Sequence, residues 1–262
     1  EGLAWRTDGG VAAILRATPS EVAVGLSFDG RPHTVLMATP SDLEDLAVGF
    51  AVSEAIADRA AIEAVEIREV DGGVLADVRL AATSPRRRGR PRGLEGRSSC
   101  GLCGVQRIAD ALRPLPEVVS QTAFTPEVVQ RAVAGIGENQ TLGRETRATH
   151  AAAFAHADGT LMAVREDVGR HNALDKLGGA LLRAGRSVSD GFIVVTSRCS
   201  FEMVEKTARF GAPMIVAISA PTDLAIQRAE LAGVTLVALA RDDGHTVFSR
   251  PDRLGLTAAT HG

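Results

Sequence analysis

Residues 192–240 decide the fold class, and they read FIVVTSRCSFEMVEKTARFGAPMIVAISAPTDLAIQRAELAGVTLVALA. Short apolar runs alternate in this stretch with longer amphipathic segments. Strands are predicted at Phe192–Thr196, Met214–Ser219 and Val234–Ala240, with helices between them at Ser200–Phe210 and Thr222–Leu231. Because strands alternate with helices of this length, we expect an α/β protein with a largely parallel sheet flanked by helices.

The alternation continues on both sides of this stretch. Thr125-Pro126 is typical of a helix start, because proline is favoured at the first helical position, and this helix is expected to end near Gly135. The other elements expected here are an irregular stretch at 137–150, a hairpin at 151–165, a helix at 172–184 and a short last strand at 246–248.

The N-terminal part has a different pattern. Residues 1–20 carry no clear signal, and the Asp29-Gly30 turn then joins two predicted strands. Thr39-Pro40 is expected to open a helix, and a second hairpin follows it. The predicted strands are Val22–Phe28, His33–Thr39, Glu63–Val70 and Val74–Leu80. We therefore expect a small α+β domain over residues 1–115 and the α/β domain over residues 116–262.

Composition narrows the function classes. The 262 residues carry a formal net charge of -3, which gives no reason to expect nucleic-acid binding, and aromatic residues make up 3%. No apolar run approaches the length of a membrane span, so no membrane association is expected. Three cysteines are too few for a disulfide scaffold, and their odd number favours reduced thiols in the cytoplasm.

Two of the cysteines lie in the segment Ser98-Ser99-Cys100-Gly101-Leu102-Cys103-Gly104. A pattern with helical spacing of apolar residues follows directly, and cationic side chains precede it. Thiols at a helix start near positive charge have their thiolate form favoured, and the thiolate is both the nucleophile and the metal ligand. The two glycines permit backbone shapes that leave the sulfurs accessible. This loop is expected to present sulfur to a partner.

An arginine-rich arm runs into this loop. Glycine and proline interleave its cations, which is typical of a mobile linker. A solvated tether is the simpler interpretation; a basic arm that holds a phosphate-rich ligand or an acidic partner near Cys100 is the other. The arginines are Arg86, Arg87, Arg88, Arg90, Arg92 and Arg97.

Three polar clusters follow predicted strands and precede predicted helices, where ligands bind in open α/β sheets. Hydroxyls, arginines and backbone N–H groups at helix starts suit phosphate, so together they predict an anion pocket, although each alone would serve as a helix cap. No G-x-G-x-x-G or Walker sequence is present. The candidate binding residues are Arg165, Asp167, Arg170, His171, Asn172, Ser197, Arg198, Ser219 and Thr222.

The C-x-x-C and His150 also allow two other interpretations, a zinc site and a zinc deaminase. Cys100 and Cys103 could form half of a zinc site that Cys199, His150 or His171 completes, but the second C-x-x-C or the H-x-H that would support it is absent. Zinc deaminases carry H-x-E before P-C-x-x-C, whereas Ala151-Ala152 follows His150 here, so the catalytic glutamate is missing. No metal site is therefore expected.

With these residues quoted, the chain resembles the FdhD family of sulfurtransferases, which activate formate dehydrogenase. The similarity runs from about Val22 to Arg253, and the C-x-x-C loop, residues 164–176 and Ser219-Ala220-Pro221-Thr222 carry it. The resemblance implies a cytidine-deaminase-like three-layer α/β domain without zinc, a smaller N-terminal α+β domain, and a homodimer.

The resemblance also implies a role. A cysteine desulfurase would load Cys100 with sulfur as a persulfide, with Cys103 as an assisting or resolving thiol. The sulfur would pass to the molybdenum or tungsten of bis-molybdopterin guanine dinucleotide (the molybdenum cofactor), which is a bound substrate, before its insertion into the formate dehydrogenase apoprotein. The resemblance implies that the family's cofactor-contacting segment corresponds to His245, Thr246, Val247, Phe248, Ser249 and Arg250. The family's Thr-Gly-Gly-x-His motif corresponds to residues 146–150, which read Thr-Arg-Ala-Thr-His here.

Two other functions fit the same residues. A non-catalytic chaperone would bind the cofactor and dock on formate dehydrogenase, with the C-x-x-C as a structural or redox latch. A dithiol oxidoreductase is disfavoured because the C-x-x-C lies outside a thioredoxin-like βαβ pattern. Substitution of Cys100 by serine separates the chaperone from the carrier, because only the carrier needs that thiol.

Overall fold

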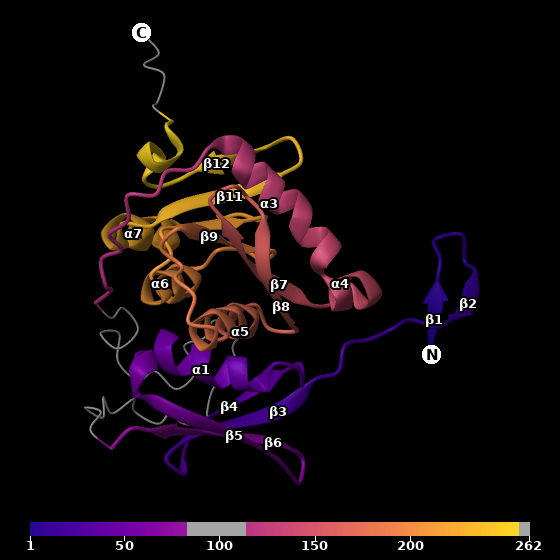
Figure 1. The fold of residues 1–262 in the computed structure, drawn as a ribbon. Coiled ribbons are helices and arrows are strands. Elements are labelled where there is room, and N and C mark those ends of the chain that lie inside the picture. The colour runs from indigo at the N-terminus through magenta and orange to yellow at the C-terminus, as the bar shows by residue number, and fades with distance from the viewer. Residues whose placement is uncertain (83–113, 257–262) are drawn as a thin grey trace.

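The structure is a computed structural model that describes residues 1–82 and 114–256 (Figure 1). The arginine-rich arm and the cysteines of the C-x-x-C loop, Cys100 and Cys103, lie outside these residues, and so does the predicted helix after Cys103. The expectations about them stay predictions.

The larger part of the fold is built on a six-stranded sheet of order β12-β11-β10-β9-β7-β8. Its central strands are continuous apolar runs, as expected for strands that are buried on both faces. The strands are β7 (His150–His156), β8 (Leu161–Asp167), β9 (Gly191–Val195), β10 (Met214–Ala217), β11 (Thr235–Arg241) and β12 (Gly244–Val247).

Helices cover both faces of this sheet, which confirms a three-layer α/β arrangement (Figure 1). Successive strand residues point to opposite faces, so Ile193 and Val195 pack in one core and Val194 packs in the other. The first core is closed by α5 (Arg170–Arg183), α6 (Phe201–Phe210) and α7 (Asp223–Ala232), and the second by α3 (Pro126–Asn139). A closer relation to cytidine deaminases stays a prediction.

The expectation of a largely parallel sheet was wrong. Only the pairs β9–β10 and β10–β11 are parallel, whereas β7 pairs antiparallel with both β8 and β9, and β12 returns antiparallel along β11. The direction of a strand depends on the end of the sheet at which the preceding connection delivers the chain. The spacing of helices and strands along the sequence does not determine that end.

The smaller part is a four-stranded sheet of order β4-β3-β6-β5 covered by one helix, α1 (Leu43–Ser53). Its strands are β3 (Val22–Phe28), β4 (Arg31–Ala38), β5 (Ile62–Val70) and β6 (Gly73–Leu80), close to the predicted positions, and a short 3-10 helix, η1 (Arg59–Ala61), precedes β5. The proposed boundary between residues 115 and 116 lies in the connection between the two sheets and stays a prediction.

The two parts meet where α1 packs directly on α5 (Figure 1). Glycines allow this close approach, because a Cβ on Gly49 would lie 1.8 Å from the Asp175 carbonyl oxygen. A Cβ on Gly179 would likewise lie 1.8 Å from the Asp45 carbonyl oxygen. The backbones of the two helices are therefore in contact, and this contact fixes the position of the smaller part of the fold against the larger part.

Three local expectations needed correction. The helix expected to open at Thr39-Pro40 begins at Leu43, because the polar groups of Thr39 bond to the large sheet instead of capping α1. The stretch expected to be irregular contains α4 (Thr141–Thr146), and residues 1–20 form the hairpin of β1 (Gly2–Trp5) and β2 (Val11–Ile14), which stands apart from the main body in Figure 1. The remaining element is a 3-10 helix, η2 (Pro251–Leu254).

Candidate functional site

Several polar residues meet at one edge of the large sheet, where the parallel strands end. Because β7 runs antiparallel to β9, and β8 antiparallel to β7, the start of β7 and the end of β8 lie at this same edge. His150 pairs with Asp167 in the hairpin, and the Thr196 N–H donates to the Ala151 carbonyl oxygen (3.0 Å). We call this the carboxyl edge, and it is where the sequence predicted a ligand pocket.

The loops after β9 and β10 are hydrogen-bonded to each other at this edge. They carry two of the polar clusters that the sequence predicted to lie close together. The Cys199 N–H donates to the Ala220 carbonyl oxygen (3.2 Å), and the Thr222 N–H donates to the Cys199 carbonyl oxygen (3.0 Å). These bonds bring the loop of Ser197 and Arg198 beside the loop of Ser219. The Thr222 hydroxyl accepts from the Ala225 N–H (3.3 Å), so this side chain caps α7.

Asp167, a predicted binding residue, is fully buried. Its Oδ1 accepts from the Gly169 N–H (2.7 Å) and from Asn172 Nδ2 (3.0 Å). Its Oδ2 accepts from the Thr39 N–H (3.0 Å) and lies 2.7 Å from Nζ of the equally buried Lys176. Both oxygens are therefore used inside the protein, and the carboxylate orders the backbone around the carboxyl edge.

Two other predicted residues also hold the small sheet against this edge. Arg165 Nε donates to Asp45 Oδ2 (2.9 Å) on α1, and Asn172 Nδ2 donates to the Met37 carbonyl oxygen (2.9 Å) on β4. These contacts join the larger part of the fold to the smaller part, so the two residues position the carboxyl edge whatever else they bind.

The first turn of α5 supplies the predicted residues Arg170 and His171. His171 Nε2 lies 3.1 Å from Glu202 Oε2 on α6, and both side chains are largely buried. His150 lies close to both residues of α5. Burial is the largest cause that lowers the pKa of His150, Arg170 and His171 lower it further, and Asp167 opposes them. Arg170 thus places positive charge near His150, from the side of α5.

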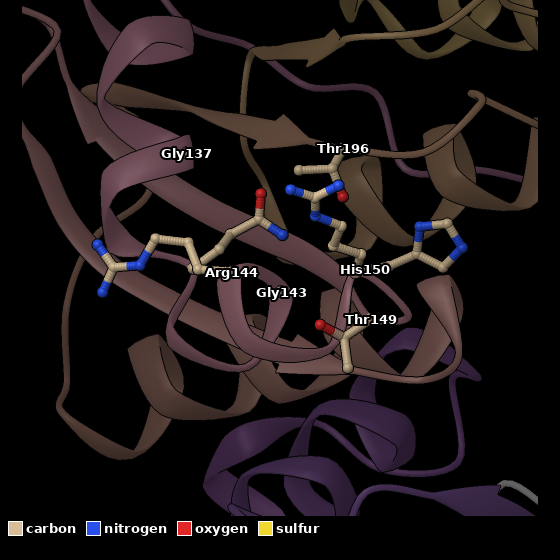
Figure 2. A pocket seen from close by; sticks show the side chains of 8 residues that line it. Gly137, Gly143, Arg144, Thr149, His150 and Thr196 are labelled. Carbon is tan, nitrogen blue, oxygen red and sulfur yellow. The ribbon is translucent and has the colours of Figure 1, made fainter. Parts of the chain in front are cut away.

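An open cavity of about 400 Å³ lies at the carboxyl edge. In Figure 2 the side chains of Arg144 and His150 lie at its two ends, with those of Thr149 and Thr196 between them. The residues that line it are Gly137, Gln140, Gly143, Arg144, Arg147, Thr149, His150 and Thr196.

Glu166 builds one wall of this cavity. Its carboxylate accepts from the N–H groups of Leu142 (2.9 Å) and Gly143 (2.7 Å), which belong to the first turn of α4, and from the Thr149 hydroxyl (3.2 Å). A carboxylate at a helix N-terminus satisfies donors that have no partner within the helix and interacts favourably with the helix dipole. This nearly buried residue of β8 therefore holds a helix that lies more than twenty residues earlier in the chain.

The sequence prediction did not name these cavity residues as binding residues. The signal available was the difference at residues 146–150, where arginine stands at the second position of the family's Thr-Gly-Gly-x-His. Arg147 ends α4 with φ 54°, in the left-handed region that favours glycine. The contribution of Glu166 and Thr196 depends on strand pairing and leaves no local sign in the sequence.

The segment His245–Arg250 occupies β12 and the turn after it. It begins at the carboxyl edge, next to the pairing of Gly244 with Arg241, and runs to the opposite edge. There the Ser249 hydroxyl donates to the Val234 carbonyl oxygen (2.8 Å) and accepts from the Leu236 N–H (2.8 Å). The start of this segment thus lies at the carboxyl edge, where His245 Nδ1 is 3.3 Å from Gln130 Oε1 on α3, and Ser249 serves strand pairing.

Cys199 is the one cysteine that the structure describes. It is fully buried, and burial raises the pKa of its thiol to about 12. Reactive cysteines need thiolate character and access, so Cys199 is a core residue. Within residues 1–82 and 114–256, no three His, Cys, Asp or Glu side chains come together as a metal-binding group.

Comparison with known proteins places the chain in a family. The model of the FdhD/NarQ family matches residues 19–255. The chain belongs to the FdhD/NarQ family. A protein of Agrobacterium fabrum named sulfur carrier protein FdhD is 48% identical over 242 residues, which cover 91% of this chain and 89% of that protein. A protein of the same name from Cupriavidus necator is 45% identical over 92% of this chain and 85% of its own length.

The fold of this FdhD/NarQ family member also matches a solved structure. The crystal structure of a protein from Desulfotalea psychrophila, thought to be a formate dehydrogenase accessory protein, superposes with a TM-score of 0.77 at 24% identity. The match covers 97% of this chain and 96% of that one, and at this identity it establishes the fold. No helix in the part of the chain that the structure describes is long and apolar enough to cross a membrane.

The burial of Cys199 leads to a chemical prediction. In the native protein at about pH 8, iodoacetamide is expected to leave Cys199 unmodified, since a thiol of pKa about 12 has about one part in ten thousand as thiolate at that pH and is closed off from the reagent. After unfolding in guanidinium it should react fully. Peptide mass spectrometry measures both states, and rapid native alkylation would show that the thiol is accessible.

Glu166 should control the order of α4. Glu166→Ala removes the acceptor of two backbone N–H groups and of the Thr149 hydroxyl, and is expected to lower the free energy of unfolding by about 1–3 kcal/mol. The amides of Leu142 and Gly143 should exchange with deuterium faster, while those of β9 keep their protection. Glu166→Gln keeps one acceptor oxygen, so its exchange rates and stability should lie between those of the parent and Glu166→Ala. Unchanged exchange of the Leu142 and Gly143 amides in Glu166→Ala would contradict the role assigned to Glu166.

Proposed function

We propose that this protein is a sulfurtransferase that carries sulfur for the maturation of formate dehydrogenase in the cytoplasm. The observation that carries the proposal is the 48% identity, over 91% of the chain, to a protein named sulfur carrier protein FdhD. The C-x-x-C of Cys100 and Cys103 supplies the thiols that such a role requires.

The burial of Cys199 supports this choice of thiols. The chain has three cysteines, and Cys199 is closed off in the core with its pKa raised to about 12. Sulfur carriage on a cysteine therefore falls to Cys100 or Cys103. The family resemblance assigns the persulfide to Cys100.

The proposed chemistry uses these two thiols in turn. The Cys100 thiolate attacks the outer sulfur of the persulfide on a cysteine desulfurase, the sulfur–sulfur bond of that persulfide breaks, and the desulfurase thiolate leaves. The Cys103 thiolate then attacks the inner sulfur of the Cys100 persulfide. A Cys100–Cys103 disulfide forms, and the outer sulfur leaves as hydrosulfide, reduced by the two electrons that the thiols give up. A cellular dithiol reductant restores both thiols.

The acceptor of this sulfur is proposed to be bis-molybdopterin guanine dinucleotide, which the protein holds as a substrate. The carboxyl edge suits its phosphates, because arginines, hydroxyls and helix starts gather there. Arg170, His171, Arg198, Ser219 and the start of the segment at His245 are the predicted residues best placed to meet it. The molybdenum chemistry itself belongs to the cofactor.

A chaperone without sulfur transfer is the second candidate, because the same edge would bind cofactor without using a thiol. The test is to load the protein with radiolabelled sulfur from a desulfurase and cysteine, and then to add cofactor and formate dehydrogenase apoprotein. We expect the label to move to the dehydrogenase as formate oxidation appears. Recovery of formate oxidation while the label stays behind would favour the chaperone. The homodimer implied by the family is checked separately by light scattering.

A further inference from the structure

The cavity at the carboxyl edge has a cation that the structure leaves available for a ligand. Among the described residues, no carboxylate pairs with the guanidinium of Arg147, whereas Arg165 at the same edge is paired with Asp45. Arg144, at the rim, donates through Nη1 to the Glu138 carbonyl oxygen (2.6 Å). The charge of Arg147 is thus offset by no residue in the described part of the chain.

The backbone of Arg147 is held in an unfavourable conformation. With φ 54° it ends α4 in the left-handed region, which costs a residue with a Cβ about 1 kcal/mol or more relative to glycine. The Arg147 N–H bonds to the Gly143 carbonyl oxygen (2.9 Å), and the Thr146 hydroxyl bonds to the Leu142 carbonyl oxygen (2.7 Å). The surrounding bonds therefore impose this conformation, and strain of this kind clusters at ligand sites.

The rest of the lining is polar. The side chains of Thr149 and Thr196 lie between the ends of the cavity (Figure 2), where their hydroxyls donate to Glu166 (3.2 Å) and to the Ala151 carbonyl oxygen (3.4 Å), and the His150 imidazole, whose pKa burial lowers, stands at one end. The Glu166 carboxylate close by is engaged by its donors from α4 and Thr149, and the Asp167 carboxylate is paired with Lys176. Arg170 adds positive charge from the first turn of α5.

From this arrangement we infer that the cavity binds the phosphate groups of a ligand, with Arg147 as the residue that sets the affinity. A planar guanidinium offers paired donors that match phosphate oxygens, and one without a protein counter-ion gives up little to bind them. The inference rests on the proposed function, and deepens it by assigning the diphosphate of the guanine-dinucleotide cofactor to a cavity outside the predicted binding residues.

The experiment measures binding of inorganic pyrophosphate by titration calorimetry to the full chain and its variants. Arg147→Ala and Arg147→Gly are expected to weaken binding roughly ten- to hundredfold, the effect of losing a charge-assisted bond to phosphate. Arg147→Lys should bind with an affinity between those of the parent and Arg147→Ala, because it keeps the charge and loses the paired donors. The matched control, Arg186→Ala, removes an exposed arginine after α5 and should change nothing.

Stability gives a second readout. Arg147→Gly should melt about 2–4 °C above Arg147→Ala, because only the alanine keeps the strained Cβ. Ala55→Gly serves as a control for strain alone, since Ala55 has φ 55° and is not a residue of the cavity lining, and should raise the melting temperature without changing pyrophosphate affinity.

Two results would overturn the inference: no pyrophosphate binding by the parent protein, or equal affinity in Arg147→Ala. The same preparations are assayed for persulfide on Cys100. Normal persulfide loading without pyrophosphate binding rejects the cavity assignment alone. Pyrophosphate binding that depends on Arg147, without any persulfide loading, rejects the sulfur carrier and leaves the phosphate site standing.

Discussion

Cys100→Ser is expected to abolish sulfur loading altogether. The parent protein, incubated with a cysteine desulfurase and cysteine, should gain the mass of one or more sulfur atoms in intact mass spectrometry without reductant, and lose it on reduction. Serine has no thiolate, so it cannot attack the outer sulfur of the desulfurase persulfide. Cys199 should not replace Cys100, because it is buried with its pKa raised to about 12, and Cys103 is proposed to act only on the persulfide that Cys100 carries.

The matched variants separate the roles of the three cysteines. Cys103→Ser should still load sulfur, but should not release it as hydrosulfide, because no second thiol remains to form the disulfide. Cys199→Ala should load and release like the parent. Loading that survives in Cys100→Ser would reassign the carrier, and no loading in any protein would leave the cofactor-binding chaperone as the function.

Lys176→Met is expected to cause the largest loss of stability. Lys176 and Asp167 are both fully buried and 2.7 Å apart, so removal of the cation leaves a carboxylate without its counter-ion inside the protein. Breaking a buried pair in this way costs about 3–5 kcal/mol. Lys176 Nζ also donates to the Thr39 carbonyl oxygen (2.9 Å), so the small sheet should loosen from the large one. Thermal and denaturant unfolding measure the change.

Two controls test the cause. Arg79→Met removes the cation of an exposed pair with Glu66 and should change stability by about 0.5 kcal/mol or less. The double variant Asp167→Asn/Lys176→Met should be more stable than Lys176→Met alone, because no unpaired charge stays buried. A double variant whose loss equals the sum of the two single losses would show that the residues are not coupled.

Elements whose own residues carry a strong pattern were predicted well. The strand Val22–Phe28 has the predicted bounds, and the helix that follows Ser200 ends at Phe210 as expected. It ends there because Gly211 takes a left-handed conformation that stops the helix locally. The start of α3 at Pro126 was likewise legible from the preference of proline for the first helical position.

Elements held by distant residues were missed. Helix α4, with sequence TLGRET, is short and contains glycine and threonine, so its intrinsic helix propensity is low. It forms against Glu166, whose carboxylate receives its first N–H groups. The start of α1 moved to Leu43 for a related reason, because Thr39 bonds to Asp167 and to the Val168 N–H. Such long-range bonds have no signature in a local window.

The sequence by itself determined the α/β class, most element positions, the C-x-x-C loop and the resemblance to a family, because each is written in neighbouring residues. Tertiary structure alone decided which polar residues bond within the protein and which line the cavity. It turned Asp167, Asn172 and Ser249 inward to protein partners, and gathered Arg147 and Thr196 around one cavity. The physical reason is that an antiparallel hairpin beside parallel strands brings distant segments to one edge, and buried polar groups must be satisfied by whatever partners that packing provides.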